Sequence, residues 1–136
     1  MKALTLTQPW AWLICAGRKH YETRSWRTHY RGTLAIHAAA TLKPAARIYA
    51  RERRIDLAAL PLGAVVATAQ LVDCIATDEV RRRLSARERD AGDYGLGRWA
   101  WELDDIHVLP VPIPARGSLG LWDWVDAIHT TYPRKR

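Results

Sequence analysis

Apolar residues occupy every second position in several short stretches of the chain. This alternation is found at residues 3–7 and 33–38 and, less regularly, at 98–109, while residues 64–75 form a longer run rich in valine and alanine. A period of two is typical of strands with one buried face, and a long β-branched run is typical of a central strand. Residues 21–26 are also expected to be extended. The pattern therefore predicts a sheet of several strands.

Two segments between these strands have helical spacing. Residues 9–16 and 44–54 both begin with proline, which suits the first position of a helix because its missing N–H would be unpaired there. Gly17 ends the first helix, and Ile48 lies on the predicted apolar side of the second. The buried stripe of the first helix is predicted at three residues: Trp10, Leu13 and Ile14.

The rest of the chain contains a charged helical segment and a proline-rich end. In residues 77–90, Ser85 and Glu88 have the spacing of a capping box, which predicts a break near residue 84. Residues 119–128 are expected to pack back onto the core. Strands with a few peripheral helices predict a mixed α+β domain whose sheet curls into a small barrel. Three prolines at alternate positions are expected to end regular strand pairing: Pro110, Pro112 and Pro114.

The chain is long enough for one hydrophobic core. A length of 136 residues with 49% hydrophobic content is too short for two cores of normal size. Residues 1–130 are therefore predicted to form a single domain, followed by a basic tail at 131–136. The tail either contacts phosphate or is an ordinary charged chain end. The composition leaves the oligomeric state open.

Composition also limits the partners. The formal net charge of +7 favours polyanions, although spare surface arginine is a plain alternative. Seven tryptophans without phenylalanine suggest that some indoles face a cleft. No window approaches the ~18 apolar residues of a membrane span, so a cytoplasmic protein without a membrane partner is expected. Cys15 and Cys74 lack zinc or disulfide spacing and are predicted to be reduced core thiols.

The candidate site is the stretch that follows the first helix, where cations, a carboxylate and an indole come close together. Lys19 and Glu22 are three residues apart on a turn that leads into a strand; they form either a functional pair or a surface ion pair worth about 0 to 1 kcal/mol. Arg24 offers a planar fork to phosphate or to a base edge. Trp26 is either a stacking surface or a core residue.

Four further residues are weaker candidates for nucleic-acid binding. The Gln8 amide either contacts a base or caps the helix start, and His37 alternates out of the apolar face of its strand toward the cleft. Tyr94 lies in a glycine-flanked loop that either closes over a ligand or anchors itself, and Ser118 is a possible phosphate donor. The histidines lack metal-ligand spacing, so no bound metal and no cofactor are expected.

A series of short motifs runs in order along nearly the whole chain. They are Gln8-Pro9-Trp10-Ala11, Gly17 with Lys19, Glu22, Arg24 and Trp26, Tyr30-Arg31-Gly32, Ile36-His37-Ala38, Pro61 with Gly63-Ala64, Gly97-Arg98 with Ala100-Trp101, Pro112-Ile113-Pro114 and Gly120-Leu121-Trp122. In these motifs the chain resembles the activating signal cointegrator homology (ASCH) domain, a member of the PUA-like β-barrel group. The resemblance implies a pseudo-barrel with a cleft facing the Gly17–Trp26 segment, and RNA or another single-stranded nucleic acid as the ligand.

The resemblance leaves the reaction open, because the family includes nucleic-acid binders, a ribonuclease and amidases that act on acetylated cytidine. The amidase branch has a lysine, which Lys19 matches, and a threonine nucleophile three residues later, where this chain has Glu22. Thr23 would change strand face. RNA binding is the leading hypothesis. The alternatives are a hydrolase of RNA or a modified nucleoside, with Lys19 and Glu22 as acid and base, and a protein-interaction module.

Overall fold

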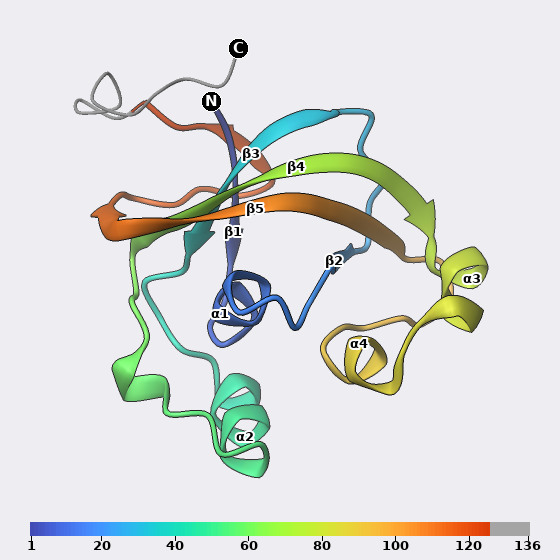
Figure 1. Ribbon diagram of the computed structural model, residues 1–136, viewed down its shortest axis with the longest axis horizontal. Helices are drawn as coiled ribbons and strands as arrows, with labels where there is room; N and C mark the ends of the chain where they lie inside the picture. The colour runs from blue at the N-terminus through green and yellow to red at the C-terminus, as the bar shows by residue number, and fades with distance from the viewer. Residues whose placement is uncertain (126–136) are drawn as a thin grey trace.

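The strands form one curled, mixed sheet. The computed structural model describes residues 1–125, and within them six strands follow the order β2-β5-β4-β3-β1-β6. Only β1 and β3 run parallel there; the other neighbours are antiparallel. The sheet curls over α1 as a half-barrel, with β2 as the edge strand beside β5 (Figure 1), which confirms the predicted fold class. The strands are β1 (Lys2–Leu6), β2 (Tyr21–Arg24), β3 (Gly32–Ala38), β4 (Ala64–Ala76), β5 (Trp99–Pro114) and β6 (Leu121–Asp123).

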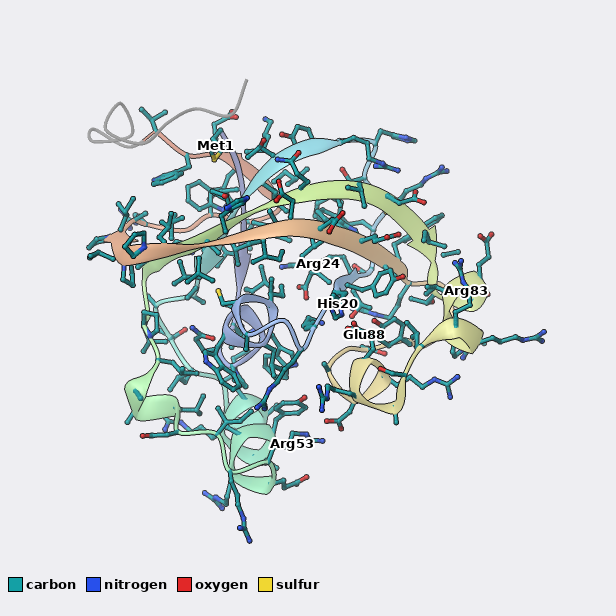
Figure 2. All side chains as sticks on the ribbon, viewed as in Figure 1. Met1, His20, Arg24, Arg53, Arg83 and Glu88 are labelled. Atoms are coloured by element: carbon teal, nitrogen blue, oxygen red, sulfur yellow. The ribbon has the colours of Figure 1, made fainter. Side chains whose placement is uncertain are left out.

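The helices are short and lie below the arch of the sheet and at its right-hand end (Figure 1). The predicted break near residue 84 is confirmed, because α4 restarts at a Ser85 cap whose hydroxyl accepts the Glu88 N–H at 3.1 Å. The Glu88 carboxylate turns instead to His20, where it accepts the backbone N–H at 2.8 Å (Figure 2). This contact joins α4 to the start of β2. The helices are α1 (Trp10–Cys15), α2 (Pro44–Glu52), α3 (Thr77–Val80) and α4 (Ala86–Asp90), with 3-10 turns at Leu57–Ala59 and Arg81–Arg83.

The core follows the predicted alternation. Leu34 and Ile36 of β3 and Leu4 and Leu6 of β1 are buried on one face of the sheet, and Trp101 of β5 is completely buried among them. Helix α1 adds Ala11, Leu13 and Ile14, whereas Trp10 is only half-buried. The predicted stripe is therefore correct for two of its three residues. Burial of this apolar area is the main force that holds the sheet and α1 together.

The prediction for the apolar side of α2 is wrong. Ile48 is 55% exposed, and the small residues Ala46 and Ala50 are the buried ones. Small side chains let the α2 backbone approach its neighbours, and the Tyr49 ring contacts the Trp10 ring at 5.1 Å between centroids. Helix α2 is thus placed beside α1, where it forms one wall of the cleft described below.

The prediction that the prolines end strand pairing is also wrong. Strand β5 continues to Pro114 and pairs with β4 as far as Ala64↔Pro114, with register shifts on the way. Alternate residues of a strand direct their N–H groups to the same edge, so three prolines at alternate positions lose their donors on one side. On the side opposite β4, β2 pairs only with Trp99–Glu102 in the described chain. The prolines therefore face an edge that needs no donors.

The end of the described chain closes the half-barrel. Strand β6 pairs antiparallel with β1, and Trp122 and Trp124 pack against Ala3, Ala35 and Val65 as expected. Of the predicted element at 119–128, the described part forms a strand at Leu121–Asp123, while residues 126–128 and the basic tail at 131–136 lie outside the described residues. Both cysteines are free, and burial raises the pKa of Cys15 to about 11. Within residues 1–125 the helices are too short and polar to cross a membrane.

Candidate functional site

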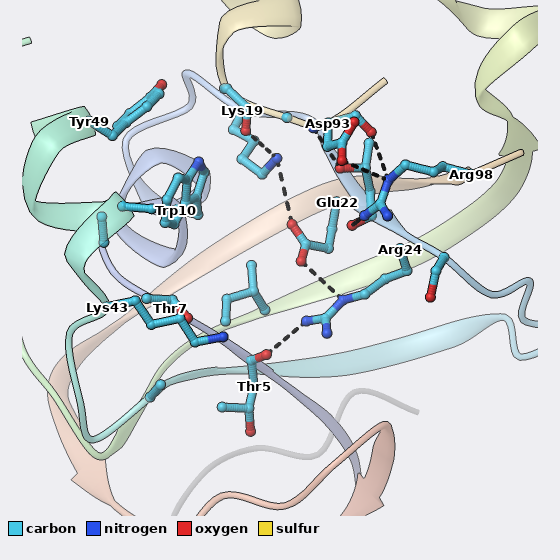
Figure 3. A pocket seen from close by; sticks show the side chains of 18 of the residues that line it. Thr5, Thr7, Trp10, Lys19, Glu22, Arg24, Lys43, Tyr49, Asp93 and Arg98 are labelled. Carbon is cyan, nitrogen blue, oxygen red and sulfur yellow. Dashed lines mark hydrogen bonds and ion pairs between the residues drawn. The ribbon is translucent and has the colours of Figure 1, made fainter. Parts of the chain in front are cut away.

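A cleft of about 740 Å³ lies between α1, α2, β2 and the end of α4 (Figure 3). The end of β1 and the loop before β6 complete its walls. Five of the eight residues predicted for the site line this cleft, and three do not. The five are Lys19, Glu22, Arg24, Trp26 and Ser118.

A chain of charges crosses the floor of the cleft. Lys19 is 1% exposed, and its Nζ donates to the Ala91 carbonyl at 2.8 Å and lies 3.6 Å from Glu22 Oε1. Arg24 Nε lies 3.1 Å from Glu22 Oε2, and its Nη2 donates to the Thr5 carbonyl at 2.7 Å. The alternative of an exposed Lys19–Glu22 pair is therefore wrong. Because these charges are shielded from water, removing one partner is costly.

The local sequence explains how these charges meet. Gly17 adopts a left-handed conformation (φ 73°), which ends α1 and lets the Lys19 N–H reach the Leu13 carbonyl at 3.2 Å. Strand β2 then pairs with β5, so that Glu22 lies opposite Trp101. Glu22 and Arg24 are two residues apart on β2 and therefore point to the same face.

Aromatic rings lie on two sides of the floor. Trp26 is 37% exposed, and its ring meets the buried Trp101 ring edge-on at 4.7 Å between centroids. The Trp101 Nε1–H also donates to the Trp26 carbonyl at 3.3 Å. Trp26 is therefore a supported ring at the cleft and not a core residue. Trp10 and Tyr49 also line the cleft, on the side away from Arg24 (Figure 3).

Sequence reasoning missed several lining residues. Arg98 lies 3.5 Å from Asp93 and donates to the Thr23 carbonyl at 3.3 Å. The carbonyl of Lys43, immediately before α2, accepts the Ala46 and Arg47 N–H groups at 3.0 and 3.2 Å, but its ammonium makes no hydrogen bond or ion pair with any other described residue. Its position before Pro44 was a sign of a helix start, but only the tertiary structure brings α2 to the segment at 19–26. The charged and aromatic lining residues that were missed include Trp10, Lys43, Tyr49, Asp93 and Arg98.

Gln8 and His37 are structural residues. Gln8 is 1% exposed; its Oε1 accepts the Trp12 N–H at 2.9 Å and its Nε2 donates to the Pro61 carbonyl at 3.1 Å, so the helix-capping alternative is confirmed. His37 is also 1% exposed, with Nδ1 3.1 Å from Thr5 Oγ1 and Nε2 2.7 Å from the Ala115 carbonyl. The prediction that His37 reaches the cleft is wrong, because both ring nitrogens bind neighbouring segments.

Tyr94 anchors its own loop. The side chain is 8% exposed and packs with Val80 and Ala100, outside the cleft lining. Burial raises the pKa of Tyr94, and neighbouring Glu88 adds to this shift. Its hydroxyl has no hydrogen-bond partner among the residues that the structure describes. In this conformation Tyr94 therefore does not close over the cleft.

A polar clasp joins α2 to the end of α4 beside the cleft. The Arg53 guanidinium lies over the Tyr49 ring at 3.7 Å from its centroid, and Arg53 Nε donates to Asp90 Oδ2 at 2.6 Å. The Tyr49 hydroxyl donates to the same oxygen at 3.3 Å. Hydrogen bonding to Arg53 lowers the pKa of Asp90 below its ordinary value. The clasp fixes the width of the cleft at this end.

Breaking the clasp is expected to have a small, acid-sensitive effect. Because Asp90 and Arg53 are partly exposed, Asp90→Asn should lower the free energy of unfolding at pH 7 by no more than about 1 kcal/mol. The folded-state pKa lies below the ordinary 3.8, so this stabilisation is complete above 3.8 and is lost as pH falls through the folded-state value. Urea denaturation at pH 7 and at about pH 2.5 measures the difference.

Glu52→Gln is the matched control, because the Glu52 carboxylate lies 3.6 Å from Arg53 but is well exposed. It should change stability little at either pH. If the difference in the free energy of unfolding between wild type and Asp90→Asn is the same at about pH 2.5 as at pH 7, the clasp does not stabilise the fold in this way.

The cleft has no evident metal centre. Among residues 1–125, no group of three or more His, Cys, Asp or Glu side chains is placed to hold a metal ion. The lining offers two lysines, two guanidinium groups, three carboxylates and aromatic rings. These groups suit a ligand with both a planar part and negative charge.

Comparison with known proteins agrees with this description. The family model of the ASCH domain matches residues 4–108. Human activating signal cointegrator 1 is 26% identical over 93% of this chain, which spans only 22% of that protein. The crystal structure of ASCH from Zymomonas mobilis has a TM-score of 0.59 at 18% identity, covering 96% of this chain and 90% of that one. A point mutant of the same protein has a TM-score of 0.58 at 18% identity, with coverage of 96% and 93%. At this identity the structural similarity concerns the fold.

Proposed function

The chain belongs to the ASCH domain family, and on that premise we propose that its cleft binds RNA or another single-stranded nucleic acid. The observation that carries the proposal is the meeting of a supported, exposed indole with fixed cations on one cleft floor. Trp26 supplies the ring, and Lys19 and Arg24 supply the cations. The family provides the premise, and the side chains of this cleft provide the chemistry.

Stacking accounts for part of the affinity. A base stacked on an aromatic ring contributes about 1 to 3 kcal/mol in single-strand binders, whatever its identity. Trp26 is held from behind by Trp101, so little conformational freedom is lost when a base stacks on it. Trp10 and Tyr49 offer a second aromatic surface across the cleft.

Phosphate attraction comes mainly from the rim. The lining includes four cationic side chains and three carboxylates, so the charges of the cleft almost balance. Lys19, Arg24 and Arg98 each lie close to a carboxylate. Lys43 makes no such contact with another described residue and is therefore the cation best suited to a phosphate. The proposed arrangement places bases inside the cleft and phosphates along its rim.

Lys43→Ala tests this arrangement. RNA affinity of the wild type should fall steeply with salt, because phosphate contacts release counterions. The variant should bind more weakly at low salt, with the slope of log affinity against log salt reduced by about one. Fluorescence anisotropy with a short single-stranded RNA measures both quantities. Arg47→Ala, an exposed charge change on α2 outside the cleft lining, is the control and should keep the wild-type slope. A slope unaffected by Lys43→Ala, or affinity independent of salt, would contradict the proposal.

A second candidate is hydrolysis of RNA or of a modified nucleoside. The observation that favours it is a buried lysine beside a carboxylate at the floor of an open cleft, since acid–base pairs in enzymes are often shielded in this way. Assays with unstructured RNA and acetylated cytidine would test it. Turnover should be abolished by Lys19→Met and Glu22→Gln, with folding checked by circular dichroism. No turnover by the wild type, or equal turnover by folded variants, would remove this candidate.

A further inference from the structure

Glu22 has unused capacity to accept hydrogen bonds. It lines the cleft with its side chain 12% exposed, and its carboxylate lies near Lys19 and Arg24. These contacts are ion pairs, and within residues 1–125 no donor makes a hydrogen bond to this carboxylate. Arg24 Nε, the nearer cationic atom, is itself buried without a hydrogen-bond partner among the described residues. A carboxylate has about four acceptor sites and no donor, so Glu22 offers the cleft free acceptors.

The ligand group that reaches Glu22 must therefore donate hydrogen bonds. A phosphate has only acceptors and a like charge, so it is disfavoured at this position. In a single strand the sugar–phosphate backbone continues in both directions and must leave the cleft at its rim. A base is a side branch with a free end, so only its edge reaches the floor. Glu22 lies between Lys19 and Arg24 on that floor (Figure 3).

Resting on the proposed nucleic-acid binding, we infer that Glu22 selects the bound base, and that this base is guanine. Guanine presents two adjacent donors, N1–H and N2–H₂, which match the two oxygens of a carboxylate. Adenine and cytosine place one amino group beside a ring acceptor, and uracil places one N–H between two carbonyls. With adenine, cytosine or uracil, an acceptor atom of the base would face a carboxylate oxygen, and no second hydrogen bond would offset the repulsion between them.

The preference is measurable with the wild-type protein alone. Uridine-rich RNAs of equal length, each with one central guanine, adenine, cytosine or uracil, should differ in affinity. A bidentate base contact provides discrimination of roughly 10-fold or more, so the guanine RNA should bind tighter than the other three by that factor. Inosine lacks the N2 amino group and keeps N1–H, so an RNA with central inosine should lose most of this advantage.

Glu22→Gln tests the residue itself. The substitution keeps the shape but replaces one acceptor with a donor, so the affinity advantage of the guanine RNA over the other three should be lost. Thermal denaturation checks that the variant is folded. A central 2′-deoxyguanosine should bind like guanosine, since the proposed contact is to the base.

The outcomes separate this inference from the proposed function. Tight binding of all four RNAs alike, or loss of affinity on removing the 2′-hydroxyl with no preference among bases, would overturn the inference and leave nucleic-acid binding intact. A guanine preference that persists in folded Glu22→Gln would also overturn it. Failure of the wild type to bind any of these RNAs would overturn both.

Discussion

Replacing Trp101 with alanine should lower the free energy of unfolding by about 3 to 5 kcal/mol, the range for removing a large buried aromatic side chain. Trp101 is completely buried and lies on β5 between Glu22 of β2 and Cys74 of β4. Its removal leaves a cavity that the rigid sheet cannot close. Urea denaturation followed by circular dichroism measures the loss.

The same substitution should weaken ligand binding under conditions where the variant is still folded. Trp26 would lose both its edge-on ring contact and the hydrogen bond from Trp101 Nε1 to its carbonyl. Trp12→Ala is the control, because Trp12 is half-buried on α1 and meets the Arg18 guanidinium at 5.2 Å from its ring centroid. Equal stability losses for the two tryptophans would show that Trp101 is not the centre of the core.

Replacing Lys19 with methionine should cost about 3 kcal/mol of stability, although methionine fills a similar volume and is more hydrophobic. The cost arises because the largely buried Glu22 carboxylate keeps, among the described residues, only Arg24 as a partner and the Ala91 carbonyl loses the Lys19 donor. The double variant Lys19→Met/Glu22→Gln removes the stranded charge. It should therefore be more stable than the single variant, which denaturant unfolding of both proteins measures.

Lys2→Met serves as the matched control for this pair. Lys2 Nζ lies 3.0 Å from Asp123 Oδ1, closer than Lys19 lies to Glu22, but both partners are exposed. Breaking the Lys2 pair should change stability by less than about 1 kcal/mol. If Lys19→Met lowers the free energy of unfolding no more than Lys2→Met does, the buried Glu22 carboxylate does not need Lys19 as a partner. The description of the cleft floor as a buried charge chain would then be wrong.

The regular parts of the fold follow from local pattern. The alternation at residues 33–38 identified β3, and the Ser85 and Glu88 spacing located the start of α4. The incorrect predictions concern features that depend on how the elements pack in three dimensions. The prolines of β5 are tolerated because β2 is too short to cover that edge, and Ile48 is exposed because α2 packs through alanines. Neither fact is encoded in the residues concerned.

The candidate site was predictable only where it is contiguous in sequence. Lys19, Glu22, Arg24 and Trp26 lie within eight consecutive residues, in β2 or directly beside it, so their grouping was visible in the sequence. Lys43 and Tyr49 reach the cleft only because α2 packs beside α1. Polar residues such as Gln8 and His37 resemble ligand-binding groups in sequence, but their partners are distant carbonyls. Sequence pattern does not separate these two uses of a polar side chain.

Crosslinking can show directly whether the cleft floor contacts the nucleic acid. A single-stranded RNA containing photoreactive 4-thiouridine would be irradiated with the protein, and the attachment sites would be mapped by mass spectrometry. The account predicts saturable crosslinks at Trp26 and at lining residues such as Trp10, Tyr49 and Ser118. Saturable crosslinks confined to the exposed arginines at 81–89, with none in the cleft, would contradict it.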